Sequence, residues 1–239
     1  MGIVDFFKKL AGPKPPAAAA NSPYTDSSTN LLYNLLFCDS LNLYKARSSQ
    51  PPTYPFDVLF ADSTTPAQLQ QLIDDPATEP RVALLAYRRQ QALGHPPTRQ
   101  ELLAIIVEVG LEDGLDVLAS FRDGTARYFN QAGKLLIWET TTDATANELT
   151  AALFASGREV IQRIGPWHEP RRPHPARGVT RLTFLVSDGL YFGEGPTEVL
   201  FADPLASATL GIATRLLQYL TETALAQPAG GAPPAPAVP

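Results

Sequence analysis

The sequence is poor in the residues that mark an oxidising compartment or a membrane span. Its 239 residues include one cysteine, Cys38, so an intramolecular disulfide is excluded and we expect a cytoplasmic protein. Cys38 lies in an apolar pattern with no basic neighbour in sequence, which favours a core thiol over a nucleophile. No apolar run reaches the roughly 18 residues that span a bilayer. We therefore expect no transmembrane segment.

Catalytic signatures are missing as well. The chain has no Gly-x-Ser-x-Gly elbow, no Gly-x4-Gly-Lys-Ser/Thr loop and no His-Glu-x-x-His helix. Gly193 and Gly195 stand between two expected strands, so they indicate a hairpin turn and not a phosphate cradle. Carboxylates near expected turns fit ordinary turn chemistry better than acid-base or Mg²⁺ chemistry; they are Glu112, Asp113, Asp116, Asp188 and Glu194. We expect no catalytic residue and no cofactor.

The charge balance bears on nucleic acids. Lysines and arginines number 19 against 24 acidic residues, for a formal net charge of -5. A general nucleic-acid binder needs a concentrated basic surface to neutralise phosphates. We therefore expect no nucleic-acid partner, although the net charge does not exclude a local basic patch.

The segment with the clearest secondary-structure signals is Gly114–Glu139, which predicts a three-stranded antiparallel meander. Asp123-Gly124 between β-forming residues is a strong hairpin signal, because a tight turn there needs positive φ. A two-residue turn would place Phe121 opposite Ala126. One face of the meander is apolar and the other mixed, so we expect a core on one side only.

Other elements follow from apolar periodicity, caps and turn residues. Thr98 and Glu101 form a capping-box pattern at the start of one expected helix, which would pair with the preceding helix as an αα-hairpin. Acidic residues on this helix argue against a DNA-reading helix-turn-helix. The expected helices span 29–44, 63–75, 80–93, 98–110, 141–164 and 205–223, and the expected strands 56–62, 181–188, 190–192 and 197–204.

One five-residue sequence occurs twice in the chain. The pentapeptide VLFAD occurs at Val58–Asp62 and again at Val199–Asp203, each time leading into an expected helix. A duplicated strand-to-helix unit would explain the repeat, and so would chance recurrence of common strand residues.

These elements predict an α+β fold. Its antiparallel sheet comes from two meanders, about 115–139 and 181–203, packed against amphipathic helices, and its N-terminal half is mainly helical. From Thr98 onward the element order, read as α-β-β-α-β-β-β-α, resembles roadblock and longin domains. That resemblance rests on element order over about half the chain and carries over no residue. It implies a dimerising scaffold or a regulator of small GTPases.

The termini differ in composition from the centre. Residues 1–10 place Ile3, Phe6, Phe7 and Leu10 on one side of a short helix, and residues 11–28 read as a flexible Pro/Ala linker. We expect one globular domain over 29–224, with a sub-boundary near 95–110, and a disordered Pro/Ala tail over 225–239. An apolar tip on a tether can dock on a protein partner. Homo-oligomerisation stays open.

The candidate binding site is the proline-rich segment between the expected helix 141–164 and strand 181–188. From Pro166 to Arg181 it carries four arginines and one acid, a formal charge of +3. Arginine forks beside an aromatic ring suit an anionic ligand or an acidic partner surface. The candidate residues are Trp167, His168, Arg171, Arg172, His174, Arg177 and Arg181.

Two other interpretations of this segment stay open. Its arginines could be solvated, or could pair with the acidic run Glu108, Glu112, Asp113 and Asp116. Its two histidines lack the fixed spacing of a zinc signature, even with Glu169 or His95 added, so we expect no metal site.

Two functions follow from these features. The leading hypothesis is a non-enzymatic interaction or scaffold protein that docks through the N-terminal helix, the basic loop or both. The alternative is a binding module or enzyme for an anionic small molecule or nucleotide, using Trp167 to Arg181. Convergence of the acidic run and the basic loop on one cleft would favour the alternative.

Overall fold

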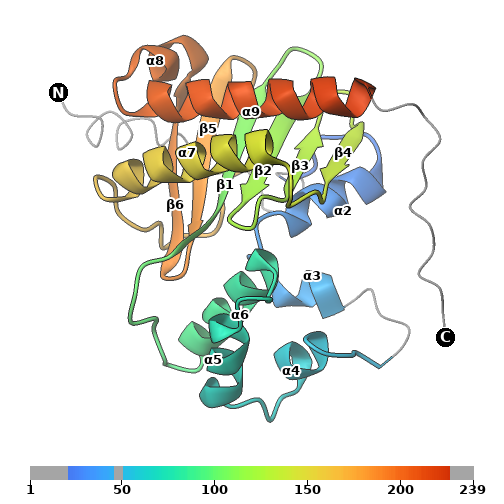
Figure 1. Ribbon diagram of the computed structural model, residues 1–239, viewed down its shortest axis with the longest axis vertical. Helices are drawn as coiled ribbons and strands as arrows, with labels where there is room; N and C mark the ends of the chain where they lie inside the picture. The colour runs from blue at the N-terminus through green and yellow to red at the C-terminus, as the bar shows by residue number, and fades with distance from the viewer. Residues whose placement is uncertain (1–20, 46–50, 227–239) are drawn as a thin grey trace.

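A computed structural model describes residues 21–45 and 51–226 of the chain (Figure 1). It has an α+β fold built on a six-stranded antiparallel sheet in the order β4-β3-β2-β1-β5-β6. The expected docking helix, at residues 1–10, and most of the expected C-terminal tail lie outside the described residues. The elements are α2 Ser27–Leu35, α3 Leu41–Lys45, α4 Phe56–Phe60, α5 Pro66–Asp74, α6 Pro80–Ala92, β1 Leu102–Gly110, β2 Leu115–Phe121, β3 Ala126–Phe129, β4 Leu135–Trp138, α7 Ala144–Ile161, β5 Val179–Val186, β6 Gly189–Pro196, α8 Thr197–Ala202 and α9 Ala206–Ala226.

The central strand β1 corrects the expected helix over 98–110. Its residues LLAIIVEVG form a nearly continuous apolar run, buried on both sides between β2 and β5. A short apolar run does not distinguish a strand from a buried helix by periodicity, and β-branched residues here favour the strand. The capping-box pattern was misleading, because Glu101 contacts Arg99 and Arg122 at the strand entrance instead. The expected αα-hairpin is therefore wrong.

The predicted meander over Gly114–Glu139 is confirmed as β2, β3 and β4, but its register differs. Ser120 lies opposite Ala126, and the amide of Phe121 donates to the carbonyl of Thr125 over 2.9 Å. The loop therefore has one residue more than a two-residue turn, with Gly124 at a φ of 90°. That extra residue shifts every predicted pair by one.

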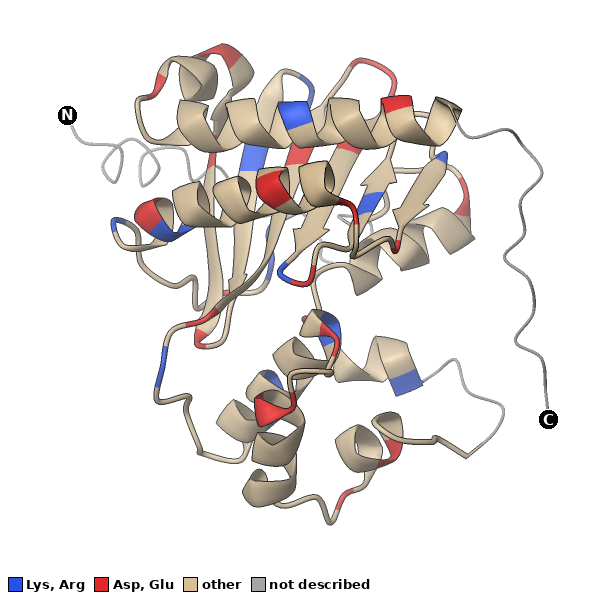
Figure 2. Cartoon of the chain, in the orientation of Figure 1, with Lys and Arg blue, Asp and Glu red and all other residues tan. Residues whose placement is uncertain are grey.

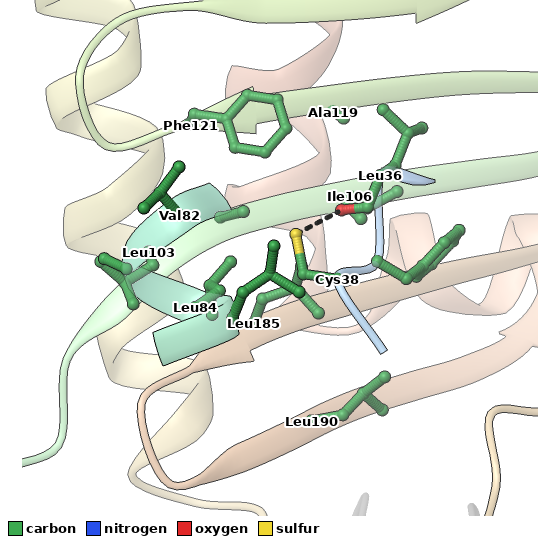
Figure 3. Packing of buried hydrophobic residues seen from close by; sticks show 14 of the residues in the cluster. Leu36, Cys38, Val82, Leu84, Leu103, Ile106, Ala119, Phe121, Leu185 and Leu190 are labelled. Carbon is green, nitrogen blue, oxygen red and sulfur yellow. Dashed lines mark hydrogen bonds between the residues drawn. The ribbon is translucent and has the colours of Figure 1, made fainter. Parts of the chain in front are cut away.

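Both faces of the sheet are covered, so the expectation of a one-sided core is wrong. Helices α7 and α9 lie across one face (Figure 1), where they enclose Ile105, Phe184 and Leu210. The opposite face packs on α2 and α6 through a second cluster, whose Leu84, Leu103, Phe121 and others appear in Figure 3. We call these the α7/α9 face and the α2/α6 face.

The second sheet segment is a hairpin, β5–β6, followed by a helix. Gly193 and Gly195 lie within β6, opposite Leu182 and Thr180, so they do not form the expected turn. Residues 197–202 form α8 in place of the expected strand, and residues 56–60 form α4 in the same way. The two VLFAD segments thus share a short helix and not a strand. With 102–110 a strand and 197–202 a helix, the element order that resembled roadblock and longin domains is not the observed one.

The N-terminal region divides where one helix was expected. Helix α2 ends near Leu36, and Cys38 adopts a φ of 49° before α3 begins. The domain also extends further upstream than expected, because Tyr24 is buried and its hydroxyl donates to the carbonyl of Leu115 over 2.9 Å. The C-terminal end of the expected flexible linker is therefore part of the core.

Four helices agree with the sequence prediction, with small shifts at their ends: α5, α6, α7 and α9. Thr65 and Gln68 cap α5 reciprocally, and Asp143 caps α7 by accepting from the amide of Ala146 over 2.8 Å. Among the helices of residues 21–45 and 51–226, none combines the length and apolar character required to cross a membrane.

Candidate functional site

The candidate loop leaves α7, crosses the edge of β6 and returns along the α2/α6 face to β5. Near its start, the amide of Trp167 donates to the carbonyl of Leu190 over 2.7 Å, forming an isolated β-bridge with β6. The Trp167 ring also packs edge-on against Phe192, with centroids 5.1 Å apart. Prolines prevent regular structure along this path. The loop is thus held against the sheet by backbone and aromatic contacts.

The end of the loop packs closely on β1. The amide of Gly178 donates to the carbonyl of Gly110 over 2.8 Å. A Cβ at Gly110 would collide with the backbone of Ala176, so only glycine allows this approach. The return path of the loop is therefore fixed by a residue at the end of the central strand.

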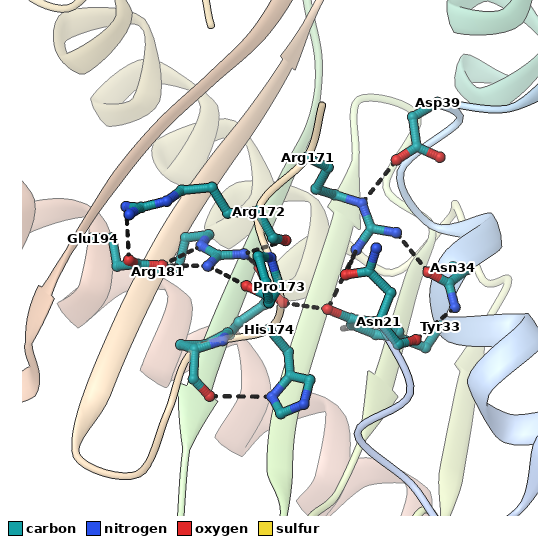
Figure 4. A network of polar contacts seen from close by, with 12 residues as sticks. Asn21, Tyr33, Asn34, Asp39, Arg171, Arg172, Pro173, His174, Arg181 and Glu194 are labelled. Atoms are coloured by element: carbon teal, nitrogen blue, oxygen red, sulfur yellow. Dashed lines mark hydrogen bonds and ion pairs between the residues drawn. The ribbon is translucent and has the colours of Figure 1, made fainter. Parts of the chain in front are cut away.

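Arg171 points inward and joins the loop to α2 and the turn after it (Figure 4). Its side chain is only 7% exposed; its Nε donates to Asp39 over 2.8 Å and its Nη2 to Asn34 over 2.5 Å. The guanidinium also lies 3.8 Å from the centroid of the Phe37 ring. Burial alone would lower the pKa of Arg171, but Asp39 and Tyr33 outweigh it and the pKa lies above its ordinary value.

Arg181, on β5, lies between two acids on the neighbouring strands. Glu108 of β1 and Glu194 of β6 are its direct cross-strand partners. The Nε of Arg181 donates to Glu194 over 2.6 Å, and its Nη1 lies 3.6 Å from the Oε2 of Glu108. Arg172 also donates to Glu194, over 3.1 Å. Charges on three adjacent strands and the loop therefore compensate one another.

Glu108 is the most enclosed member of this group. Its side chain has no exposed surface, and its Oε1 accepts a 2.6 Å hydrogen bond from the hydroxyl of Tyr33 on α2. Burial, followed by the charge of Glu108, raises the pKa of Tyr33 well above its ordinary value, so the hydroxyl remains a donor. Because a buried carboxylate needs compensation, the Tyr33 and Arg181 contacts are what allow Glu108 to occupy the core.

These contacts define what we call the buried arginine network: Asp39, Glu108, Arg171, Arg172, Arg181 and Glu194, together with Tyr33 and Asn34. It includes three of the four arginines predicted from the sequence. The fourth, Arg177, lies at the surface and pairs with Glu112 over 2.8 Å, both side chains being 68% exposed. The pairing of loop arginines with acids, one of the open interpretations, is therefore observed for Arg181 and Arg177.

The two candidate histidines differ in exposure. His168 is exposed, whereas His174 is half-buried, with its Nδ1 3.3 Å from the carbonyl of Pro175. Within residues 21–45 and 51–226, no group of three or more His, Cys, Asp or Glu side chains is placed to hold a metal ion. Asp116, from the acidic run, faces away from the loop and contacts Tyr128 and the amide of Gln131.

The acidic run and the basic loop meet at two ion pairs, Glu108 with Arg181 in the interior and Glu112 with Arg177 at the surface, and not in a cleft. Hollows in the described part of the chain lie elsewhere: one of about 250 Å³ is lined by residues including Tyr87, His95 and Arg99, and one of about 310 Å³ by residues including Arg122 and Arg158. Neither is lined by an arginine of the buried arginine network.

Several members of the network were missed by sequence reasoning. Asp39, Tyr33 and Asn34 lie more than 130 residues before their partner Arg171, and no local pattern connects them. Glu194 was detectable in principle, because a hairpin turning at Ser187 and Asp188 places it opposite Arg181. The decisive information was thus the register of β5–β6.

Cys38 is a core thiol, as its apolar context predicted. It is 1% exposed among Leu36, Leu84 and Leu185 (Figure 3). Burial raises the pKa of its thiol to about 11, which leaves little thiolate at neutral pH. The sulfur is therefore a packing group and not a nucleophile.

Comparison with known proteins adds no assignment to this geometry. The chain matches no family model and no curated protein sequence.

Proposed function

We propose that this protein is a non-enzymatic interaction or scaffold protein, and that the arginine-rich loop is a structural strap within it. The observation that carries the proposal is the state of Arg171, Arg172 and Arg181, each of which already faces a carboxylate. An anion entering here would have to replace a buried ion pair, at a cost of several kcal/mol (about 3–5) for the partner left behind. Rigid support of a binding surface, and not ligand capture, is the role that these contacts favour.

The proposed docking elements are the N-terminal segment and the outer surface of the loop. The N-terminal segment, with Ile3, Phe6, Phe7 and Leu10, is proposed from its sequence alone and lies outside the described residues. On the loop, His168 and Arg177 are exposed and remain available to a partner. The single buried cysteine favours a reducing, cytoplasmic setting, which we include in the proposal.

The proposal is tested by affinity isolation with the full chain and two variants, followed by binding measurements with each purified partner. One variant lacks residues 1–20, and the other carries His168→Ala and Arg177→Ala. A partner that binds the full chain and loses at least tenfold in affinity for either variant supports the proposal and identifies the docking element. Equal binding by all three chains would remove both elements from it.

The competing function, a module for an anionic small molecule, is separated by thermal shift. The full chain is screened against inorganic phosphate, nucleotides and phosphorylated metabolites, with Arg172→Ala as the matched variant, because Arg172 is the most exposed arginine of the buried arginine network. A ligand bound at 100 times its Kd would stabilise the fold by about 2.7 kcal/mol. Stabilisation that disappears in Arg172→Ala would replace the scaffold proposal with the ligand-binding one.

A further inference from the structure

The repeated pentapeptide VLFAD forms two short helices with different surroundings. In α4, Val58 and Phe60 are half-buried against the core of the α2/α6 face, and the ammonium of Lys45 lies 5.8 Å from the centroid of the Phe60 ring. In α8, the corresponding Val199 and Phe201 are 45% and 47% exposed. The leucine between them is buried in both helices. The same side chains are thus covered in the first helix and open in the second.

The open side chains of α8 border a hollow. Successive residues of a helix are about 100° apart, so Val199 and Phe201 stand on either side of the buried Leu200. Ala202 lies on the outward side and has only a methyl group. A hollow of about 460 Å³ is lined here by residues that include Val199, Ala202 and Pro204. We call Glu198, Val199, Phe201, Ala202 and Asp203 the α8 surface.

The α8 surface is acidic. Figure 2 shows acidic positions on and beside α8 and no basic position on the helix. Asp203 accepts from the amides of Leu205 and Ala206 at the start of α9, over 2.9 Å each. Among the described residues, no arginine, lysine or histidine forms an ion pair with Glu198 or Asp203. Charge complementarity therefore favours an apolar occupant that is also basic.

Residues 1–10 combine these two properties. Their sequence, MGIVDFFKKL, places two phenylalanines directly before Lys8 and Lys9, and the two lysines outnumber the single acid, Asp5. The expected helix carries its apolar side chains on one side. Helix α3, which precedes α4 and supplies Lys45, has the same order of apolar residues and then lysine in LNLYK. The segment that supplies a lysine to the first VLFAD helix thus resembles residues 1–10.

The described chain begins within reach of α8. Asn21 lies 3.5 Å from the guanidinium of Arg171, and the next loop residue, Arg172, pairs with Glu194, three positions before α8 (Figure 4). Residues 11–20 extend up to about 33 Å. That length is about twice the radius of gyration of about 16 Å expected for a domain of this size. The linker is therefore long enough to bring the N-terminus to α8.

We propose that residues 1–10 dock on the α8 surface of the same chain. The phenylalanines cover the open apolar side chains, and Lys8 and Lys9 face the two acids. A short tether gives the segment an effective concentration in the millimolar range, which favours it over the same segment of a second copy. A partner that binds residues 1–10, as proposed above, would then have to displace them from α8.

The contact is tested in the full chain by paramagnetic relaxation. Gly2→Cys carries a nitroxide, whereas Cys38, at 1% exposed, should escape labelling under native conditions. The amide signals of Val199 and Phe201 should lose at least half of their intensity relative to the reduced label. The amide of Ile137, another exposed apolar residue, should keep its signal.

Charge exchange tests the choice of occupant. Lys8→Glu together with Lys9→Glu should restore most of the lost intensity, because it places like charges opposite the acids of α8. Adding Glu198→Lys should make the signals weaken again, and the exposure of Glu198 allows this change without loss of the fold. As a matched control, Lys14→Glu makes the same charge change outside the docking segment and should leave the signals of α8 as they are in the parent chain.

Three outcomes would overturn the proposal: no signal loss at α8, signal loss centred on Ile137 in its place, or signal loss at α8 that ignores both charge changes. A mixture of the nitroxide chain with an isotope-labelled chain lacking nitroxide identifies the source. Equally strong signal loss in that mixture would assign the contact to a second copy and overturn the proposal as well. The test needs no partner, so its failure leaves the proposed function standing.

Discussion

Removing Arg181 from the buried arginine network should leave the buried carboxylate of Glu108 without a positively charged partner. In Arg181→Met the side-chain volume is nearly kept, but Glu108, with no exposed surface, retains only the hydroxyl of Tyr33. Glu194 keeps Arg172 as its partner, whereas the carbonyls of Arg172 and Pro173 also lose the hydrogen bonds that Arg181 donates to them. Breaking a buried ion pair in this way typically costs about 3–5 kcal/mol, and we expect a loss of that size in the free energy of unfolding.

A second change should relieve the first. Glu108→Gln removes the unpaired charge and keeps an oxygen that accepts the hydrogen bond from Tyr33. The double variant, Arg181→Met with Glu108→Gln, should therefore be more stable than Arg181→Met alone by at least about 1 kcal/mol. The measurement is urea unfolding of the four chains, followed by tryptophan fluorescence. As a control, Arg177→Met breaks the exposed pair with Glu112 and should change stability by only about 0–1 kcal/mol. A double variant no more stable than Arg181→Met would refute the account of Glu108 as a compensated buried charge.

Two further outcomes follow from burial and packing. Because burial raises the pKa of the Cys38 thiol to about 11, a thiol reagent at pH 8 should label the native chain far more slowly than the chain in urea, and equal rates would contradict the buried position. Gly157→Ala would place a Cβ 2.7 Å from the Cδ1 of Ile105 and should destabilise the fold by about 1–3 kcal/mol in thermal or urea unfolding. At Gly211, in a helix, an added Cβ would have no atom within 4 Å, so Gly211→Ala should instead stabilise the fold by about 0.5–1 kcal/mol. A gain of stability in both glycine variants would contradict the packing of α7 on β1.

Local signals predicted the elements whose caps and periodicity agree. Helix α5 combines a reciprocal cap with proline in its first turn, and α7 is capped by Asp143. In both helices the residues that stabilise the N-terminus lie within a few positions of it, so the local sequence predicts where the helix begins. The same is true of the meander, where Asp123-Gly124 and the flanking β-formers act locally.

The errors arose where distant contacts decide. The apolar run over residues 102–110 does not by its periodicity distinguish a strand from a helix; its position between β2 and β5 makes it a strand. In the loop, the arginine composition was visible, but the destination of each guanidinium was not. Arg171 finds Asp39 only because the chain folds a segment 132 positions away against it. Composition therefore located the polar site, while tertiary structure decided that its charges turn inward.

The bridge between Trp167 and β6 has a consequence for the size of any assembly. A sheet with two open ends is a unit that can be repeated, and chains joined end to end in that way have no natural limit. Here one end is already occupied by the protein's own loop. A strand that added to β6 at Leu190 would first have to displace Trp167, so the tryptophan bridge acts as a guard against edge-to-edge association at this point.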